Sequence, residues 1–128
     1  MQKNIVHRDL AVRNILIGND NTVKIGDFGM ARVIPYGETT WRMKNPAKLP
    51  IRYLSPEVME TKVFSEASDV WAFGITMWEL MAYAETPYET DGIGVTQIRR
   101  FIIDGGRPRI PSVPLRVACY ICFHICAV

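Results

Sequence analysis

The 128-residue sequence predicts one domain of the α+β class, mainly α-helical, with a short β-hairpin near its N-terminus. The helices are predicted by two stretches, residues 65–84 and 93–103, the first almost wholly apolar and the second apolar on one side. The hairpin is predicted by residues 15–25, where two β-prone runs flank a turn rich in Gly, Asn and Asp. A chain of this length can bury a substantial core.

The stretch 65–84 gives the strongest helix signal. Almost every position from Val70 to Met81 is apolar, and a helix that is apolar all round is expected to be buried all round. The apolar run is too short for a membrane span, which needs about 20 apolar residues. Either Ser65 or Ser68 can cap its N-terminus.

The remaining segments follow from turn and breaker residues. Ser55-Pro56-Glu57 predicts the start of a short helix over about 57–60, because proline favours the first helical turn. Gly105-Gly106 ends the helix at 93–103. Residues 30–50 contain three prolines and are expected to form a long irregular segment, which inside a domain is usually functional or disordered.

Chemistry-bearing residues gather near the N-terminus. Asp9, Arg13 and Asn14 alternate with apolar residues, a pattern that pins a loop into a core and directs its polar groups to one site. Antiparallel pairing in the hairpin should bring Asp27 close to Asn14, and a carboxylate beside an amide oxygen suits a hard cation such as Mg²⁺. Taken singly, either motif is better explained by a hairpin followed by a solvated Asp-Phe-Gly turn.

Composition excludes several classes. The chain is 48% hydrophobic and 22% charged, and its net charge of +2 gives no basis for binding nucleic acid or an anionic membrane. The N-terminus lacks the apolar core of a signal peptide, and no apolar run is long enough to span a membrane. All three cysteines lie within 119–126, so the body of the chain suits a reducing compartment.

Four motifs occur together in a familiar order: His7-Arg8-Asp9 with Asn14, then Asp27-Phe28-Gly29, Ser55-Pro56-Glu57 and Ser68-Asp69-Val70-Trp71. The set resembles the C-terminal lobe of a protein kinase, over about residues 1–115. The resemblance implies a protein kinase-like fold represented by that lobe alone. Ala11 and Arg13 in the catalytic loop, and the run Lys48–Tyr53, resemble the tyrosine kinases in particular.

The resemblance also implies roles. Asp9 would accept the proton of a substrate tyrosine, and Arg13 would offset negative charge beside it. Asn14 and Asp27 would hold Mg²⁺, with Mn²⁺ as an alternative ion, on the phosphates of ATP. Leu16 would form the apolar floor under the adenine. The protein would act in the cytoplasm, or on the cytoplasmic side of the plasma membrane if its parent is a receptor, on proteins that carry tyrosine.

Further residues match supporting positions of the family. These are His7 as a structural residue, Arg8 as the holder of a phosphorylated activation segment, Asp69 as the carboxylate that steadies the catalytic loop, and Phe28 and Gly29 beside Asp27. Glu57 matches a residue that pairs with a later Arg, and Pro50 and Arg52 match the wall that receives the substrate. Tyr36 is a candidate phosphorylation site, although Thr39 and Thr40 occupy the usual neighbourhood of the regulatory tyrosine.

The sequence also departs from the family. The glycine-rich loop and the ATP-anchoring Lys that precede the catalytic loop in kinases do not occur here, so the chain alone is expected to be inactive. Tyr53 stands where relatives usually have Trp. From about residue 116 to 128 the resemblance gives way to an apolar tail with three cysteines, better explained by truncation or read-through than by a metal site.

Two functions remain open at this level. The chain is either the catalytic lobe of a protein tyrosine kinase, active within a longer protein, or a catalytically inactive kinase-like lobe that acts as a protein-binding module. Intact Asp9, Asn14 and Asp27 favour the first. The missing upstream elements favour the second for the chain as it stands.

Overall fold

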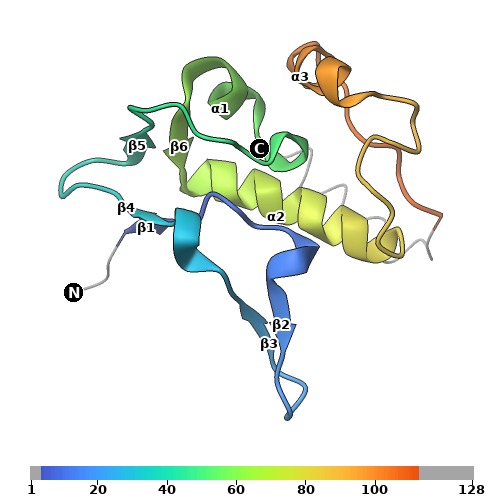
Figure 1. Ribbon diagram of the computed structural model, residues 1–128, viewed down its shortest axis with the longest axis horizontal. Coiled ribbons are helices and arrows are strands. Elements are labelled where there is room, and N and C mark those ends of the chain that lie inside the picture. Colours follow the sequence, from blue (N-terminus) through green and yellow to red (C-terminus); the bar gives the residue numbers. More distant parts are fainter. Residues whose placement is uncertain (1–3, 113–128) are drawn as a thin grey trace.

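The computed structural model describes residues 4–112 of the chain (Figure 1). Within this range the helices are α1 (Pro56–Thr61), α2 (Glu66–Met81) and α3 (Val95–Ile103). The strands are β1 (Ile5–Val6), β2 (Ile15–Ile17), β3 (Val23–Ile25), β4 (Arg32–Val33), β5 (Thr40–Arg42) and β6 (Val63–Ser65). The predicted apolar tail lies outside the described residues.

Helix α2 is the central element, with α1 and α3 on one side of it and the β2–β3 hairpin projecting from the other (Figure 1). Its N-terminus is capped by both candidate serines. The amide of Ser68 donates to Ser65 Oγ (3.4 Å), and the amide of Ser65 donates to Ser68 Oγ (3.0 Å). This reciprocal capping box satisfies two amides that the helix itself leaves unpaired.

The prediction that α2 is buried all round is wrong for one face. Trp71, Ile75 and Trp78 are buried, whereas Val70, Phe73 and Leu80 are 38–45% exposed. The exposed residues are spaced by three and seven positions and therefore lie along one stripe of the helix. Within residues 4–112 the neighbours of α2 pack mainly on its other faces, so apolar sequence alone did not reveal which side is covered.

The core forms where the N-terminal loop, α1, α2 and α3 meet. Its fully buried members come from segments distant in sequence: Val6, Val58, Phe64, Ile75, Tyr88, Ile98 and Ile102. The catalytic-loop residues Leu10 and Ala11 belong to the same cluster. Burying such side chains contributes about 1.5–3 kcal/mol each, which fixes the loop against α2.

Three two-stranded antiparallel sheets complete the fold. The predicted hairpin forms, with Ile15 paired to Ile25, but its second strand begins at Val23, so Thr22 lies in a connection one residue longer than expected. The segment 30–50, expected to be irregular, contributes two short strands. In these, β4 pairs with β1, and β5 pairs with β6 in a register that sets Trp41 opposite Phe64.

Candidate active site

The backbone of the N-terminal loop is held by a carboxylate from α2. Asp69 accepts hydrogen bonds from the amide of His7 (Oδ2, 2.6 Å) and from the amide of Arg8 (Oδ1, 3.0 Å). Arg8 has a positive φ of 70°, which is unfavourable for a residue with a side chain. Two charge-assisted hydrogen bonds on this turn offset that strain and lock the loop onto the central helix.

The Asp9 carboxylate is held from two sides. One oxygen accepts from the Arg13 guanidinium, and the other accepts from Asn14 Nδ2 (3.1 Å). Asn14 Nδ2 also donates to the backbone carbonyl of Asp9 (2.7 Å), within a 3₁₀ turn over Val12–Asn14. The Asp9 side chain is 12% exposed, so it is oriented by its neighbours and still reachable from solvent.

His7 ties this loop to the end of the hairpin. Its Nδ1 accepts from the amide of Asp9 (3.3 Å), so the proton lies on Nε2, which donates to the carbonyl of Gly26 (3.0 Å). The ring also meets Phe28 edge to face, with centroids 4.9 Å apart. The side chain is buried, in keeping with a structural position between the two motifs.

The chain brings the second motif beside the first through the hairpin. The amide of Gly26 donates to the carbonyl of Asn14 (2.8 Å), so Asp27 follows directly on a residue bonded to Asn14. An added Cβ at Gly26 would lie 2.8 Å from Leu16 Cδ1, so the exposed Leu16 side chain would have to shift. Asp27 itself has a φ of 53°, and its Oδ1 accepts from the amide of Gly29 (3.2 Å).

The donor set fits a hard cation. Within residues 4–112, neither Asn14 Oδ1 nor Asp27 Oδ2 takes part in a hydrogen bond, because Asn14 donates to Asp9 through its nitrogen and Asp27 accepts through its other oxygen. Mg²⁺ commonly uses one or two such oxygens and completes its shell with phosphate and water. No cluster of three His, Cys, Asp or Glu occurs in the described part of the chain.

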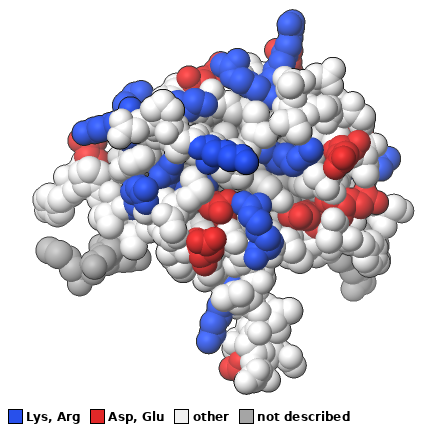
Figure 2. Space-filling view, in the orientation of Figure 1, with Lys and Arg blue, Asp and Glu red and all other residues white. Residues whose placement is uncertain are grey.

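The hairpin side of this site is exposed. Leu16 is 56% and Phe28 60% exposed, and Ile17 and Val23 are still more exposed. Figure 2 shows acidic and basic side chains interspersed where the hairpin joins the body, and few charges on the hairpin itself. The apolar surface predicted to lie under an adenine is therefore present and open.

The predicted substrate-wall residues Pro50 and Arg52 lie at or within the 3₁₀ turn that ends at Tyr53, and Tyr53 contacts Arg13 of the Asp9 loop. Arg52 donates to the carbonyl of Pro87 (2.6 Å), and Pro50 precedes a 3₁₀ turn over Ile51–Tyr53. Tyr53 donates to Glu79 Oε2 of α2 (2.7 Å), and the Arg13 guanidinium lies 5.4 Å from the centre of its ring. Burial, followed by the hydrogen bond to Glu79, raises the pKa of Tyr53.

Tyr53 and Trp41 contact residues of the predicted site, and the sequence did not predict these contacts. Tyr53 links Arg13 to α2, and Trp41 packs against the guanidinium of Arg8 at 4.4 Å. For Trp41 the available signal was a large aromatic residue in a segment, residues 38–42, that is otherwise polar. Of the remaining candidates, Tyr36 is fully exposed, and exposed Glu57 forms no ion pair within the described range.

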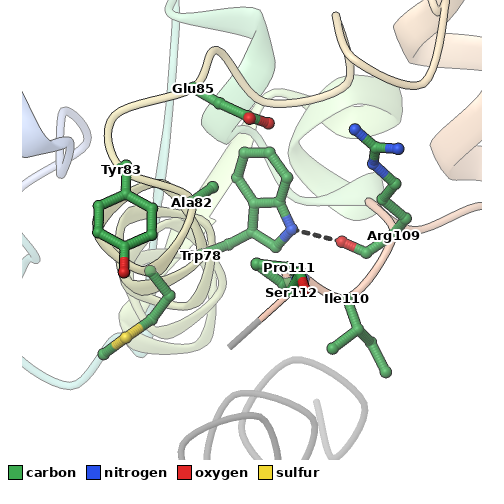
Figure 3. Close-up of a pocket in the computed structure, with 9 residues that line it drawn as sticks. Trp78, Ala82, Tyr83, Glu85, Arg109, Ile110, Pro111 and Ser112 are labelled. Atoms are coloured by element: carbon green, nitrogen blue, oxygen red, sulfur yellow. Dashed lines mark hydrogen bonds between the residues drawn. The ribbon is translucent and has the colours of Figure 1, made fainter. Parts of the chain in front are cut away.

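A separate pocket of about 340 Å³ lies at the far end of α2 (Figure 3). Trp78 forms one wall, and its Nε1 donates to the carbonyl of Arg109 (2.6 Å). None of the predicted site residues lines this pocket. The chemistry-bearing groups therefore converge at the loop and hairpin and not here.

A fixed carboxylate beside an arginine, with oxygen donors for a hard cation on Asn14 and Asp27, is an arrangement that phosphoryl-transfer sites use. The family model "Protein tyrosine and serine/threonine kinase" matches residues 1–122, and the chain belongs to this family. This match and the relatives described next confirm the prediction of a protein tyrosine kinase domain at the level of the family.

The chain is similar to receptors of the insulin group. It is 46% identical over 104 residues to the insulin receptor of Xenopus laevis and 48% identical over 101 residues to the insulin-like growth factor 1 receptor of Bos taurus. These alignments cover 81% and 79% of this chain but only 7% and 15% of the relatives. A match to an insulin-like peptide receptor of Branchiostoma lanceolatum, 45% identical, covers 86% and 8% respectively.

The chain thus spans a small part of the length of the relatives that it matches. The family generally uses ATP and Mg²⁺. Across residues 4–112, no helix has both the length and the apolar character that a membrane crossing requires.

Proposed function

We propose that this chain supplies the catalytic loop and the metal-binding turn for transfer of the ATP γ-phosphoryl group to tyrosine in the complete protein. The observation that carries the proposal is the Asp9 carboxylate, held between Arg13 and Asn14 on a backbone fixed by Asp69. A carboxylate positioned in this way can accept the hydroxyl proton of a substrate.

Asp9, Arg13 and Tyr53 would have distinct tasks. Asp9 accepts the proton of the tyrosine hydroxyl and orients the oxygen toward the phosphorus. Arg13 remains charged at any physiological pH and offsets the negative charge that gathers beside Asp9. The ring of Tyr53 lies against the Arg13 guanidinium, and the Tyr53 hydroxyl donates a hydrogen bond to Glu79.

Asn14 and Asp27 are the residues that would hold Mg²⁺ on the phosphates, through Asn14 Oδ1 and Asp27 Oδ2. When bound, the ion would neutralise phosphate charge in the transition state. The apolar side chain of Leu16 would lie under the adenine, and Pro50 and Arg52 would border the substrate. His7 keeps the base and the metal-binding turn in one frame through its bonds to Asp9 and Gly26.

The substrates would be proteins that carry tyrosine, and the reaction would take place in the cytoplasm or on the cytoplasmic side of the plasma membrane. Similarity to the insulin group of receptors supports this placement. We propose that the partial kinase domain spans residues 1–115.

The test uses a chimera, because the chain spans only a small part of its relatives. This chain replaces the matching segment of the bovine insulin-like growth factor 1 receptor kinase, and phosphate transfer to a Glu-Tyr copolymer is measured. Asp9→Asn should lower turnover by at least about a hundredfold, since it removes the proton acceptor while preserving shape.

Asp20→Asn in the exposed hairpin turn is the matched control and should leave turnover within about twofold, because surface substitutions of this kind are nearly neutral. Asp27→Asn should raise the Mg²⁺ concentration needed for half-maximal activity. Full activity of the Asp9→Asn chimera would refute the proposal. A folded wild-type chimera without turnover would favour the alternative, a kinase-like binding module.

A further inference from the structure

Trp41 lies in β5, between the Asp27 turn and α1. The proposed function assigns no direct role to Trp41. Strand β5 pairs with β6, and the register sets Trp41 opposite Phe64, with ring centroids 6.1 Å apart. The amide of Met43 continues the pairing through a bond to the carbonyl of Lys62 (3.0 Å). The backbone of this segment is therefore held on one side by β6.

The side chain of Arg8 lies against the faces of both rings. Its guanidinium carbon lies 4.4 Å from the centre of Trp41 and 4.5 Å from the centre of Phe64. Its terminal nitrogens donate to the carbonyl of Met30 (3.1 Å) and to Met43 Sδ (3.7 Å). Arg8 therefore contacts the segment at three separate points while its own backbone is bound to Asp69.

The charge of Arg8 is compensated mainly by aromatic faces. Arg8 is 5% exposed, and within residues 4–112 its side chain forms no ion pair and its Nε has no hydrogen-bond partner. Burial, followed by repulsion from Arg32, lowers the pKa of this guanidinium, and Asp69 acts in the opposite direction. A buried cation without a paired anion is costly unless other groups stabilise it.

A second arginine approaches the same indole. The guanidinium carbon of Arg32 lies 5.9 Å from the Trp41 ring, so the ring lies near two cations. The indole is the best side chain for such a contact, and the stabilisation grows when the pair is shielded from water. Leucine could fill a similar space but could not stabilise either charge.

We infer that Trp41 is a positioning residue that clamps residues 30–43 onto the catalytic loop through Arg8, so that this segment is ordered without a phosphate. The consequence for turnover rests on the proposed function, whereas the ordering of the segment does not. The chain of contacts runs from Asp69 through Arg8 to Trp41, and so couples α2, the catalytic loop and β5.

The test measures amide hydrogen exchange of residues 38–45 in the 128-residue chain after phosphatase treatment. The wild-type amides that pair with β6 should be protected without phosphate. Trp41→Leu should speed their exchange about tenfold, and Trp41→Phe, which keeps an aromatic face, should restore most of the protection. Tyr36→Leu is the control, because Tyr36 is fully exposed and should change nothing at β5.

A double-mutant cycle separates the cation contact from simple packing. In an Arg8→Met background the nearer of the two cations is gone, so Trp41→Leu should then speed exchange much less than in the wild type, by about twofold, through the remaining contacts with Arg32 and Phe64. An equal effect of Trp41→Leu in both backgrounds would overturn the inference, as would a Leu variant as protected as Phe. A wild-type segment that gains protection only on phosphorylation would also overturn it. These readouts require no turnover, so they stand apart from the Asp9→Asn test.

Discussion

The catalytic loop and the hairpin beside it differ sharply in how they are held. Within the loop, His7, Arg8 and Asn14 are each less than 8% exposed, and their polar groups bond to α2, to the loop itself or to the hairpin end. On the hairpin, Ile17 is 75% and Val23 68% exposed. The two regions adjoin in sequence and are joined by the bond between Gly26 and Asn14.

The difference indicates which half of the site is preorganised by these residues. The Asp9 carboxylate, the proposed proton acceptor, is held by contacts within the described chain and would need little rearrangement to act. The turn at Asp27, proposed to bind the metal, is positioned by the Gly26–Asn14 backbone bond, by the bond from His7 to Gly26 and by the His7–Phe28 contact, next to an open apolar surface. The proposed base is therefore held more tightly than the proposed metal side.

The largest expected effect compares one residue type in the two regions. Ile75→Ala on α2 removes a side chain with no exposed surface and should lower the free energy of unfolding by about 3 kcal/mol, the usual cost of a core cavity. Ile17→Ala on the hairpin should change it by less than about 0.5 kcal/mol. Urea denaturation of the two variants measures the difference.

Equal losses in the two variants would contradict the comparison, because they would mean that the hairpin is as tightly packed as the core. Circular dichroism before denaturation verifies that each variant starts from the same helical content. An unchanged dependence on urea concentration shows that the substitutions altered stability and not the mechanism of unfolding.

A smaller effect on stability is expected at Tyr53, which supports the loop through Arg13. Tyr53→Phe removes the hydrogen bond to Glu79 and should cost about 1 kcal/mol at neutral pH. Because the pKa of Tyr53 is raised in the folded state, its neutral form is favoured there. Its contribution is therefore complete below its usual pKa of about 10 and is lost as the pH rises above that value.

The wild-type protein should accordingly lose stability above about pH 10 more steeply than Tyr53→Phe. Burial also raises the pKa of Tyr88, so some loss in this range should remain in the variant. Tyr36→Phe, at an exposed position, should follow the wild-type curve. A Tyr53→Phe curve parallel to the wild type would show that this hydroxyl does not couple to folding.

The sequence predicted the features that depend on local pattern. The hairpin followed from its turn residues, α2 from its apolar run and serine caps, and the approach of the chain before Asp27 to Asn14 from pairing at the hairpin ends. These depend on contacts close in the chain, where composition and spacing carry the information.

Contacts between distant segments could not be predicted in the same way. The exposed stripe on α2 depends on which elements pack against it. The contact of Arg8 with both Trp41 and Phe64 depends on the pairing of β5 with β6, two strands that no hairpin turn connects. Tyr53 departs from the residue usual in relatives, yet its hydroxyl gains a partner in Glu79 that the sequence pattern does not indicate.

Amide hydrogen exchange, followed residue by residue by NMR, tests the difference between the two regions most directly. The amides of His7 and Arg8, which donate to Asp69, should exchange at least about tenfold more slowly than those of the β2–β3 ladder, because exposed hairpins open locally. Asp69→Asn should remove most of this difference without affecting the hairpin. Hairpin amides as slow as those of His7 and Arg8 in the wild type would contradict a catalytic loop fixed in advance beside a freer metal-binding turn.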